Sequence, residues 1–145
     1  MNFHLKLNFS GDTIPPDIII LNPSSTLISD SQGLRDCINV FSERYRDLNI
    51  DYIVGIESRG FIIGSAMAVK LNKGFIMIRK PGKLPGRIIQ QEYELEYGKD
   101  KIEMQADAFS SGSRILLVDD LVATGGTIMA AIKLIEKLGG EIFET

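Results

Sequence analysis

The sequence predicts an α/β domain in which helices cover both faces of an open, mostly parallel β-sheet. Two observations lead to this fold class. Short apolar runs alternate with segments of helical periodicity, and the loops of most distinctive composition follow the ends of those runs. The chain of 145 residues has the length of one domain, so we expect a single domain over residues 1–145. Ligands of such sheets bind beyond the carboxyl ends of the strands.

Hydrophobic spacing assigns the individual elements. Apolar residues recur every three or four positions in the helical segments, whereas the strands are short, nearly continuous apolar runs. Gly139 and Gly140 follow the last periodic residue, as expected at a helix end. In chain order, the expected elements are a helix at 31–48, a strand at 51–56, a helix at 61–71, strands at 74–79 and 114–119, and a helix at 126–138.

The region between residues 80 and 105 has a different character. PGKLPG (81–86) interrupts regular structure, and EYELEYG (92–98) alternates with a period of two before a further strand at 101–105. We expect a β-hairpin that protrudes as a mobile flap.

Composition and charge limit the function. The hydrophobic share of 44% and the charged share of 24% are ordinary for a globular protein, and a net charge of −3 gives no general attraction for nucleic acid. Cys37 is the single cysteine, so no intrachain disulfide is possible, and no apolar run resembles a signal peptide or a membrane span. We expect a cytoplasmic protein that binds neither nucleic acid nor a membrane.

The most informative motif is VDDLVATGGT (118–127), which joins the last strand to the last helix. Its glycines let the backbone approach an anion, its threonine hydroxyls add donors, and a helix N-terminus favours negative charge. The lysine of a Walker P-loop is missing, so a monophosphate fits better than a nucleoside triphosphate. The two carboxylates suit a ribose diol. The motif therefore indicates a ribose 5-phosphate, held by Asp119, Asp120, Ala123, Thr124, Gly125, Gly126 and Thr127.

A simpler interpretation of this motif is a tight turn with an acidic helix N-terminus. It accounts for the glycines or for the acids, but not for both in this order.

Four segments together resemble adenine phosphoribosyltransferase, a family with the type I phosphoribosyltransferase fold. The resemblance is continuous from about residue 51 to residue 138, and the basic loop and the flap are its most specific parts. It implies the formation of AMP and pyrophosphate from adenine and phosphoribosyl pyrophosphate. The segments are IVGIESRGFIIG (53–64), IRKPGKLPG (78–86), EYELEYG (92–98) and VDDLVATGGT (118–127).

The resemblance also implies roles for charged loop residues. Ser58 and Arg59 fall in the loop that binds pyrophosphate, which in this fold typically contains a cis peptide bond. Arg79, Lys80 and Lys83 fall in a loop that contacts pyrophosphate, in part across the interface of a homodimer. Without the resemblance, these cations would equally suit a solvated surface.

In the flap, Glu96 and Tyr97 match positions that the family places over the reacting centre. Departure of pyrophosphate builds positive charge at the anomeric carbon, and adenine loses a proton as its N9 attacks. We expect Glu96 to stabilise or shuttle that proton and Tyr97 to cover the ribose and exclude water. Mg²⁺ is the implied cofactor. Because no side chains have metal-site spacing, the ion would be held by substrate oxygens and water.

Two parts of the chain depart from the family pattern. The base-pocket stretch Pro-Gly-x-x-Phe-x-Asp has its nearest counterpart at residues 16–22, where Ile20 replaces the aromatic residue. The chain also ends at Thr145, where the family continues, so we expect a shortened carboxyl end.

These departures leave two alternatives open. The first is a phosphoribosyltransferase for hypoxanthine, xanthine or orotate, and the second is a module that senses phosphoribosyl pyrophosphate or nucleotide without turnover. A Rossmann dinucleotide binder is disfavoured because no GxGxxG follows the first predicted strand.

Overall fold

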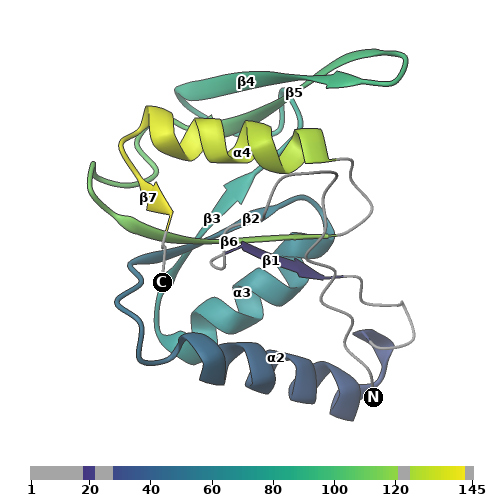
Figure 1. Ribbon diagram of the computed structural model, residues 1–145, viewed down its shortest axis with the longest axis vertical. Helices are drawn as coiled ribbons and strands as arrows, with labels where there is room; N and C mark the ends of the chain where they lie inside the picture. The colour runs from purple at the N-terminus through teal and green to yellow at the C-terminus, as the bar shows by residue number, and fades with distance from the viewer. Residues whose placement is uncertain (1–17, 22–27, 121–124, 143–145) are drawn as a thin grey trace.

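The structure is a computed structural model that describes residues 18–21, 28–120 and 125–142. Within these residues the main sheet has five strands, all paired in parallel, in the order β1-β6-β2-β3 with β7 also paired to β6 (Figure 1). Two more strands form an antiparallel hairpin. The elements are β1 (Ile18–Leu21), α2 (Ser31–Tyr45), β2 (Tyr52–Ile56), α3 (Arg59–Leu71), β3 (Gly74–Ile78), β4 (Ile88–Leu95), β5 (Gly98–Gln105), β6 (Arg114–Asp120), α4 (Gly125–Lys137) and β7 (Glu141–Ile142).

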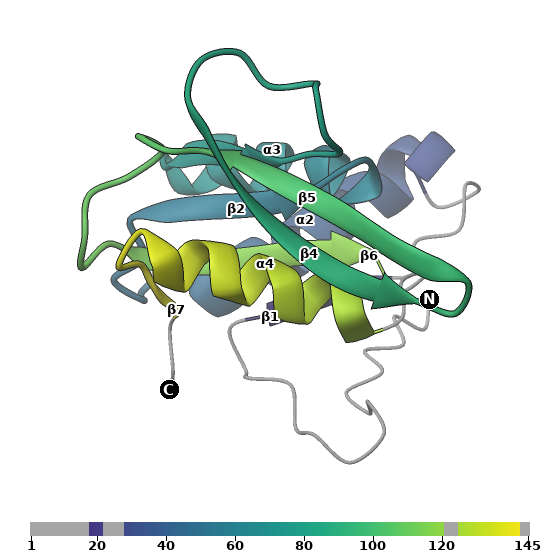
Figure 2. The ribbon, with the colours of Figure 1, turned by 90° about the horizontal axis from the view of Figure 1, so that it is seen from above.

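Helices cover both faces of the main sheet, as predicted. α2 and α3 pack on one face, whereas α4 and the β4–β5 hairpin pack on the other (Figures 1 and 2). Alternate residues of β6 serve the two faces: Leu116 and Val118 pack with α2 and α3, and Ile115 and Leu117 pack with α4. Because both faces are covered, this strand is a continuous apolar run in the sequence.

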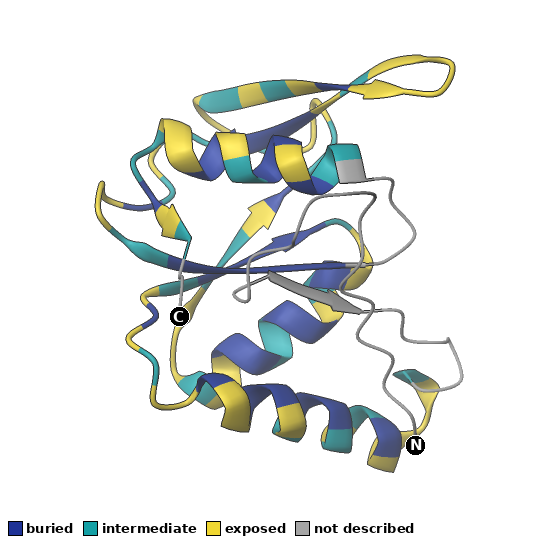
Figure 3. Ribbon diagram, in the orientation of Figure 1, coloured by how far each residue is buried: buried dark blue, intermediate teal, exposed yellow. Residues whose placement is uncertain are grey.

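Burial distinguishes the central strand β6 from the tip of the hairpin (Figure 3). The central strand β6 is buried from Ile115 to Asp119. In the hairpin, Tyr93 and residues 102–104 are buried, whereas the residues near the tip are exposed or partly exposed. The hairpin is therefore packed along its length as far as Tyr93, and its tip beyond that residue is exposed.

The structure differs from the expected elements at the ends of segments. α2 stops at Tyr45 instead of residue 48, and the hairpin begins at Ile88 instead of residue 92. The pair Ile88-Ile89 followed by Gln90-Gln91 does not alternate, so the start of β4 gave no strand signal. The short strands β1 and β7 were not predicted, and β1 falls within residues 16–22.

None of the described helices combines the length and the apolar character that a bilayer crossing requires.

Candidate functional site

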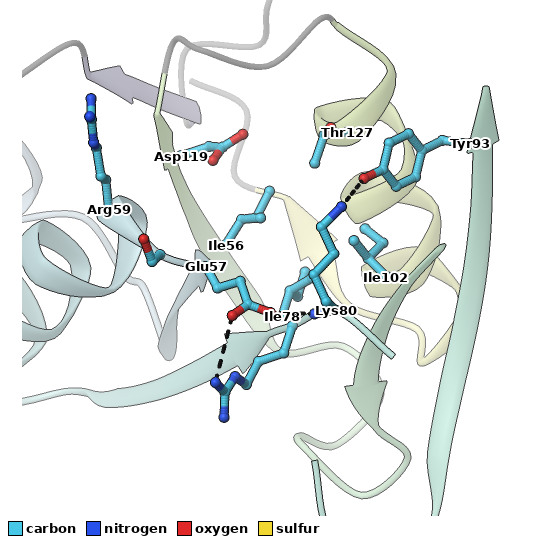
Figure 4. Close-up of a pocket in the computed structure, with 11 residues that line it drawn as sticks. Ile56, Glu57, Arg59, Ile78, Lys80, Tyr93, Ile102, Asp119 and Thr127 are labelled. Atoms are coloured by element: carbon cyan, nitrogen blue, oxygen red, sulfur yellow. Dashed lines mark hydrogen bonds and ion pairs between the residues drawn. The ribbon is translucent and has the colours of Figure 1, made fainter. Parts of the chain in front are cut away.

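A cavity of about 310 Å³ opens where the central strands end (Figure 4). Four segments that are distant in sequence meet there, because parallel strands end at one edge of the sheet. They are the loop after β2, the end of β3, the hairpin at Tyr93 and Ile102, and the junction of β6 with α4. The lining residues are Ile56, Glu57, Ser58, Arg59, Ile78, Arg79, Lys80, Tyr93, Ile102, Asp119 and Thr127.

Several of the site residues predicted from the sequence line the cavity. Six of them line it, namely Ser58, Arg59, Arg79, Lys80, Asp119 and Thr127. Asp120 ends β6, and Gly125 and Gly126 begin α4, so their backbones border this lining. Ala123 and Thr124 lie outside the described residues. The predicted phosphate turn therefore does connect a strand end to a helix start beside the other candidate residues.

Glu96 and Tyr97 are separate from the cavity in this structure. They form the turn between Leu95 and Gly98, which are paired at the tip of the hairpin, and Tyr97 is 95% exposed. The hairpin runs over α4, and its tip extends past the first turn of that helix, at the end of the molecule where the parallel strands finish (Figures 1 and 2). The tip must move for either side chain to reach the cavity.

A close backbone contact positions the loop after β2. The Glu57–Ser58 peptide bond is cis, as the resemblance implied. Gly60, in the first turn of α3, approaches β6 so closely that a Cβ there would lie 2.8 Å from the Val118 carbonyl oxygen. Glycine permits this approach because it has no side chain. The start of α3, which carries Arg59, is thus held beside the end of β6.

Glu57 pairs with the cations of the basic loop (residues 79–86), a role that was not predicted from the sequence. Its side chain is 13% exposed, accepts a hydrogen bond from the Lys80 backbone N–H, and pairs with Lys83 Nζ (3.2 Å) and Arg79 Nη2 (3.6 Å). Burial alone would raise its pKa, but these donors and charges hold the pKa of Glu57 below its ordinary value. Lys83, also a predicted site residue, is thereby drawn to the cavity wall.

The basic loop is fastened to the hairpin by a second acid. Arg79 and Glu103 exchange two backbone hydrogen bonds of 3.0 and 2.8 Å. The Glu103 carboxylate is buried and accepts hydrogen bonds from the Gly82 backbone N–H (2.6 Å) and from Gln90 Nε2 (2.7 Å). Glu57 and Glu103 therefore both hold the basic loop, through different residues of it.

Lys80 reaches from the basic loop to the hairpin (Figure 4). Its ammonium donates to the Tyr93 hydroxyl (2.6 Å) and to the Asp100 carboxylate, and Tyr93 donates to Asp100 (3.2 Å). Burial alone would lower the pKa of Lys80, but the hydrogen bonds with Asp100 and Tyr93 raise it above its ordinary value. The bond from Lys80 in turn lowers the pKa of Asp100. A cation at the cavity is thus balanced by a carboxylate of the hairpin.

The chain is similar to known proteins over most of its length. Residues 25–145 match the family model of the phosphoribosyl transferase domain. The chain is 54% identical to the adenine phosphoribosyltransferase of Chlorobium phaeobacteroides (strain BS1) over 132 aligned residues. The aligned region covers 90% of this chain and 75% of that protein.

Two solved structures share the fold. Adenine phosphoribosyltransferase from Saccharomyces cerevisiae, complexed with D-2,5-dideoxy-2,5-imino-altritol 1,6-bisphosphate and adenine, has a TM-score of 0.76 and 40% identity, covering 81% of this chain and 69% of that one. The Trypanosoma brucei adenine phosphoribosyl transferase, in complex with AMP, pyrophosphate and ribose-5-phosphate, has a TM-score of 0.74 and 36% identity, covering 81% of this chain and 52% of that one.

Proposed function

The chain belongs to the phosphoribosyltransferase family, and we propose that it transfers the 5-phosphoribosyl group from phosphoribosyl pyrophosphate to adenine, giving AMP and pyrophosphate in purine salvage. The observation that carries the proposal is the single cavity in which two basic segments, the Asp119 carboxylate and the start of α4 meet. Each of these matches one part of the substrate: the pyrophosphate, the ribose hydroxyls and the 5-phosphate.

Pyrophosphate fits between the loop after β2 and the basic loop. Ser58 and Arg59 approach the cavity from one side, and Arg79 and Lys80 approach it from another, with Lys83 nearby. Cationic donors bind phosphate oxygens through charge-assisted hydrogen bonds, and an arginine can do so with two parallel bonds. We assign these five residues to the leaving group.

The ribose 5-phosphate fits beside the junction of β6 and α4. The Asp119 side chain is buried at the cavity, and Asp120 follows it at the strand end. We assign the two acids to the ribose hydroxyls, and residues 123–127 to the 5-phosphate at the helix N-terminus.

The reaction replaces one bond at the anomeric carbon by another. The bond to the pyrophosphate oxygen breaks, a bond to adenine N9 forms, and the N9 proton leaves. We propose that Glu96 accepts that proton and that Tyr97 excludes water from the site. Both roles require the exposed tip of the hairpin to close over the cavity.

The residues at the cavity fit Mg²⁺ that is carried mainly by the substrate. The described carboxylates in the lining are Glu57 and Asp119, and Glu57 is already engaged by cations of the basic loop. No group of three metal-binding side chains occurs among the described residues. Mg²⁺ accepts such a setting because it keeps several waters and binds substrate phosphates. When bound, it would offset the charge of the pyrophosphate oxygens.

A homodimer is also part of the proposal. β3 lies at an edge of the main sheet among the described strands, and apolar side chains are exposed on β3 and on α3: Met77 is 40% exposed and Val69 is 83% exposed. Open strand edges and exposed apolar groups are features that a second copy can cover. Sedimentation velocity should therefore give a dimer, and an active monomer at all concentrations would contradict this part.

We further propose a cytoplasmic location. Cys37 is a free, buried thiol, and a chain with one cysteine makes no intrachain disulfide, which is usual in reducing compartments. Cell fractionation tests this.

The function itself is tested by one assay with a panel of bases. Purified chain, Mg²⁺ and phosphoribosyl pyrophosphate are mixed separately with adenine, hypoxanthine, xanthine and orotate, and nucleotide is measured. AMP from adenine is the expected product. A nucleotide from another base alone would assign a different base, and binding without any product would indicate a sensing module.

A further inference from the structure

The hairpin supplies the counter-ion for one cation of the basic loop. Arg79 and Lys83 are paired with Glu57, whereas Lys80 is paired with Asp100 on β5. Since Lys80 lines the cavity (Figure 4), the negative charge of Asp100 acts on a residue of the cavity wall.

The geometry leaves Lys80 able to bind an anion while it remains in place. An ammonium has three donors, and Asp100 and the Tyr93 hydroxyl take two of them. The side chains of Lys80 and Asp100 are 42% and 32% exposed, so the pair is open to solvent and is not fixed in the core. An anion that enters the cavity can therefore take the third donor, but it then lies near the negative charge of Asp100.

We propose that Asp100 is a positioning residue that limits the affinity of the site for pyrophosphate by partly neutralising Lys80. The inference rests on the proposed function, which supplies pyrophosphate as the anion facing Lys80. A carboxylate beside the ammonium weakens the attraction that a pyrophosphate experiences, and it also repels that anion directly. Both effects favour release of the product.

The variant Asp100→Asn removes the negative charge beside Lys80 and keeps a side chain of similar shape in its place. The asparagine carbonyl can still accept a hydrogen bond from Lys80, but the negative charge is gone. By isothermal titration of the full chain with pyrophosphate and Mg²⁺, we expect Kd to fall about two- to fivefold, the scale of a partly exposed ion pair. The inhibition constant of pyrophosphate should fall by a similar factor, whereas the KM for adenine should not change.

Four further variants make the test specific. Glu94→Gln removes the same charge from the same hairpin, and the Glu94 side chain is exposed and makes no hydrogen bond or ion pair among the described residues, so Kd should stay close to that of the wild type. Asp100→Glu restores the charge and should return Kd toward the wild-type value.

Lys80→Met should weaken pyrophosphate binding. In the double variant Lys80→Met/Asp100→Asn, the loss of Asp100 should lower Kd much less than it does in the wild-type background.

Several outcomes would overturn the inference. Unchanged or weaker pyrophosphate binding by Asp100→Asn, with a wild-type circular dichroism spectrum, is one. Equal tightening by Glu94→Gln is another, because the effect would then reflect net charge alone. A wild-type chain that binds pyrophosphate but forms no AMP would instead contradict the proposed function and leave this measurement valid. Absence of pyrophosphate binding would overturn both.

Discussion

The main sheet and the hairpin contribute to the same cavity with opposite physical properties. β6 brings Asp119 to the cavity, and this strand is buried on both faces. Leu116 and Val118 pack on one face of the sheet, and Leu117 packs on the other. The hairpin is packed through buried residues such as Tyr93 and Ile102, while its tip beyond Tyr93 is exposed. The difference indicates that the sheet fixes where the substrate binds and that the exposed tip of the hairpin can move without loss of the fold.

The two regions are joined at the cavity by charge as well as by apolar packing, since Ile56 and Ile78 belong to the same hydrophobic cluster as Tyr93 and Ile102. Glu57 pairs with the basic loop from the sheet side, and Asp100 pairs with it through Lys80 from the hairpin side. Such pairs are partly exposed and exchange partners at low cost, as a binding site for a charged substrate requires.

The largest expected effect comes from a change at the hairpin tip, which we expect to act in catalysis without contributing to stability. Glu96→Gln should lower kcat for AMP formation by about 10²- to 10⁴-fold, the usual contribution of a general acid or base. Because Glu96 is exposed, the free energy of unfolding should not change by more than about 0.5 kcal/mol. Glu94→Gln is the matched control, with activity close to the wild type. Unchanged turnover of Glu96→Gln at saturating substrate would remove the assigned role.

A matched pair of leucines compares the stability of the two regions. Leu117 is fully buried, so Leu117→Ala should lower the free energy of unfolding by about 2–5 kcal/mol. Leu95, next to the hairpin tip, is 46% exposed, and Leu95→Ala should change it by about 0.5 kcal/mol or less. Urea denaturation followed by circular dichroism measures both. Equal losses would mean that the hairpin tip is as much a part of the folded core as β6.

On the sheet side, Asp119→Asn tests a fixed binding group. Loss of a charged hydrogen-bond acceptor should lower kcat/KM by about 10- to 100-fold, or roughly 1.5–3 kcal/mol. Asp107→Asn, an exposed acid in the turn after β5, is the control. If kcat/KM for AMP formation remains that of the wild type, Asp119 does not contact the ribose.

The smallest expected effect is the pH dependence of Glu57. Its pKa in the folded chain lies below the ordinary value of 4.5, so the ionised carboxylate stabilises the fold above that value, and the contribution is lost as the pH falls toward the folded pKa. Unfolding experiments from pH 7 to pH 3 should show wild type more stable than Glu57→Gln by about 1 kcal/mol at neutral pH, with the gap closing under acid. A gap that widens as the pH falls would mean that the pKa is raised.

Local signals in the sequence predicted the sheet and its helices. β6 is a continuous apolar run, and α2 has apolar residues at helical spacing with the buried Cys37 in register. Residues 118–127 were recognised because the chemistry of a phosphate turn is encoded in consecutive residues. The strands β1 and β7, with four and two residues, are too short to give a period.

The acids that arrange the cations could not be predicted in the same way. Glu57 and Lys83 are 26 positions apart, Lys80 and Asp100 are 20 apart, and Gly82 and Glu103 are 21 apart. These contacts depend on how β2, β3 and β5 are placed next to one another, which periodicity does not report. The roles of Glu96 and Tyr97 stay predictions, since both lie at the exposed tip.

The central claim, transfer of a phosphoribosyl group to adenine, is tested most directly by competition. Purified chain with Mg²⁺ and a limiting amount of phosphoribosyl pyrophosphate is given adenine, hypoxanthine, xanthine and orotate together, and nucleotides and pyrophosphate are quantified by chromatography. We predict AMP as the nucleotide product, with one pyrophosphate released for each AMP. A different nucleotide, or consumption of phosphoribosyl pyrophosphate without any nucleotide, would contradict the claim.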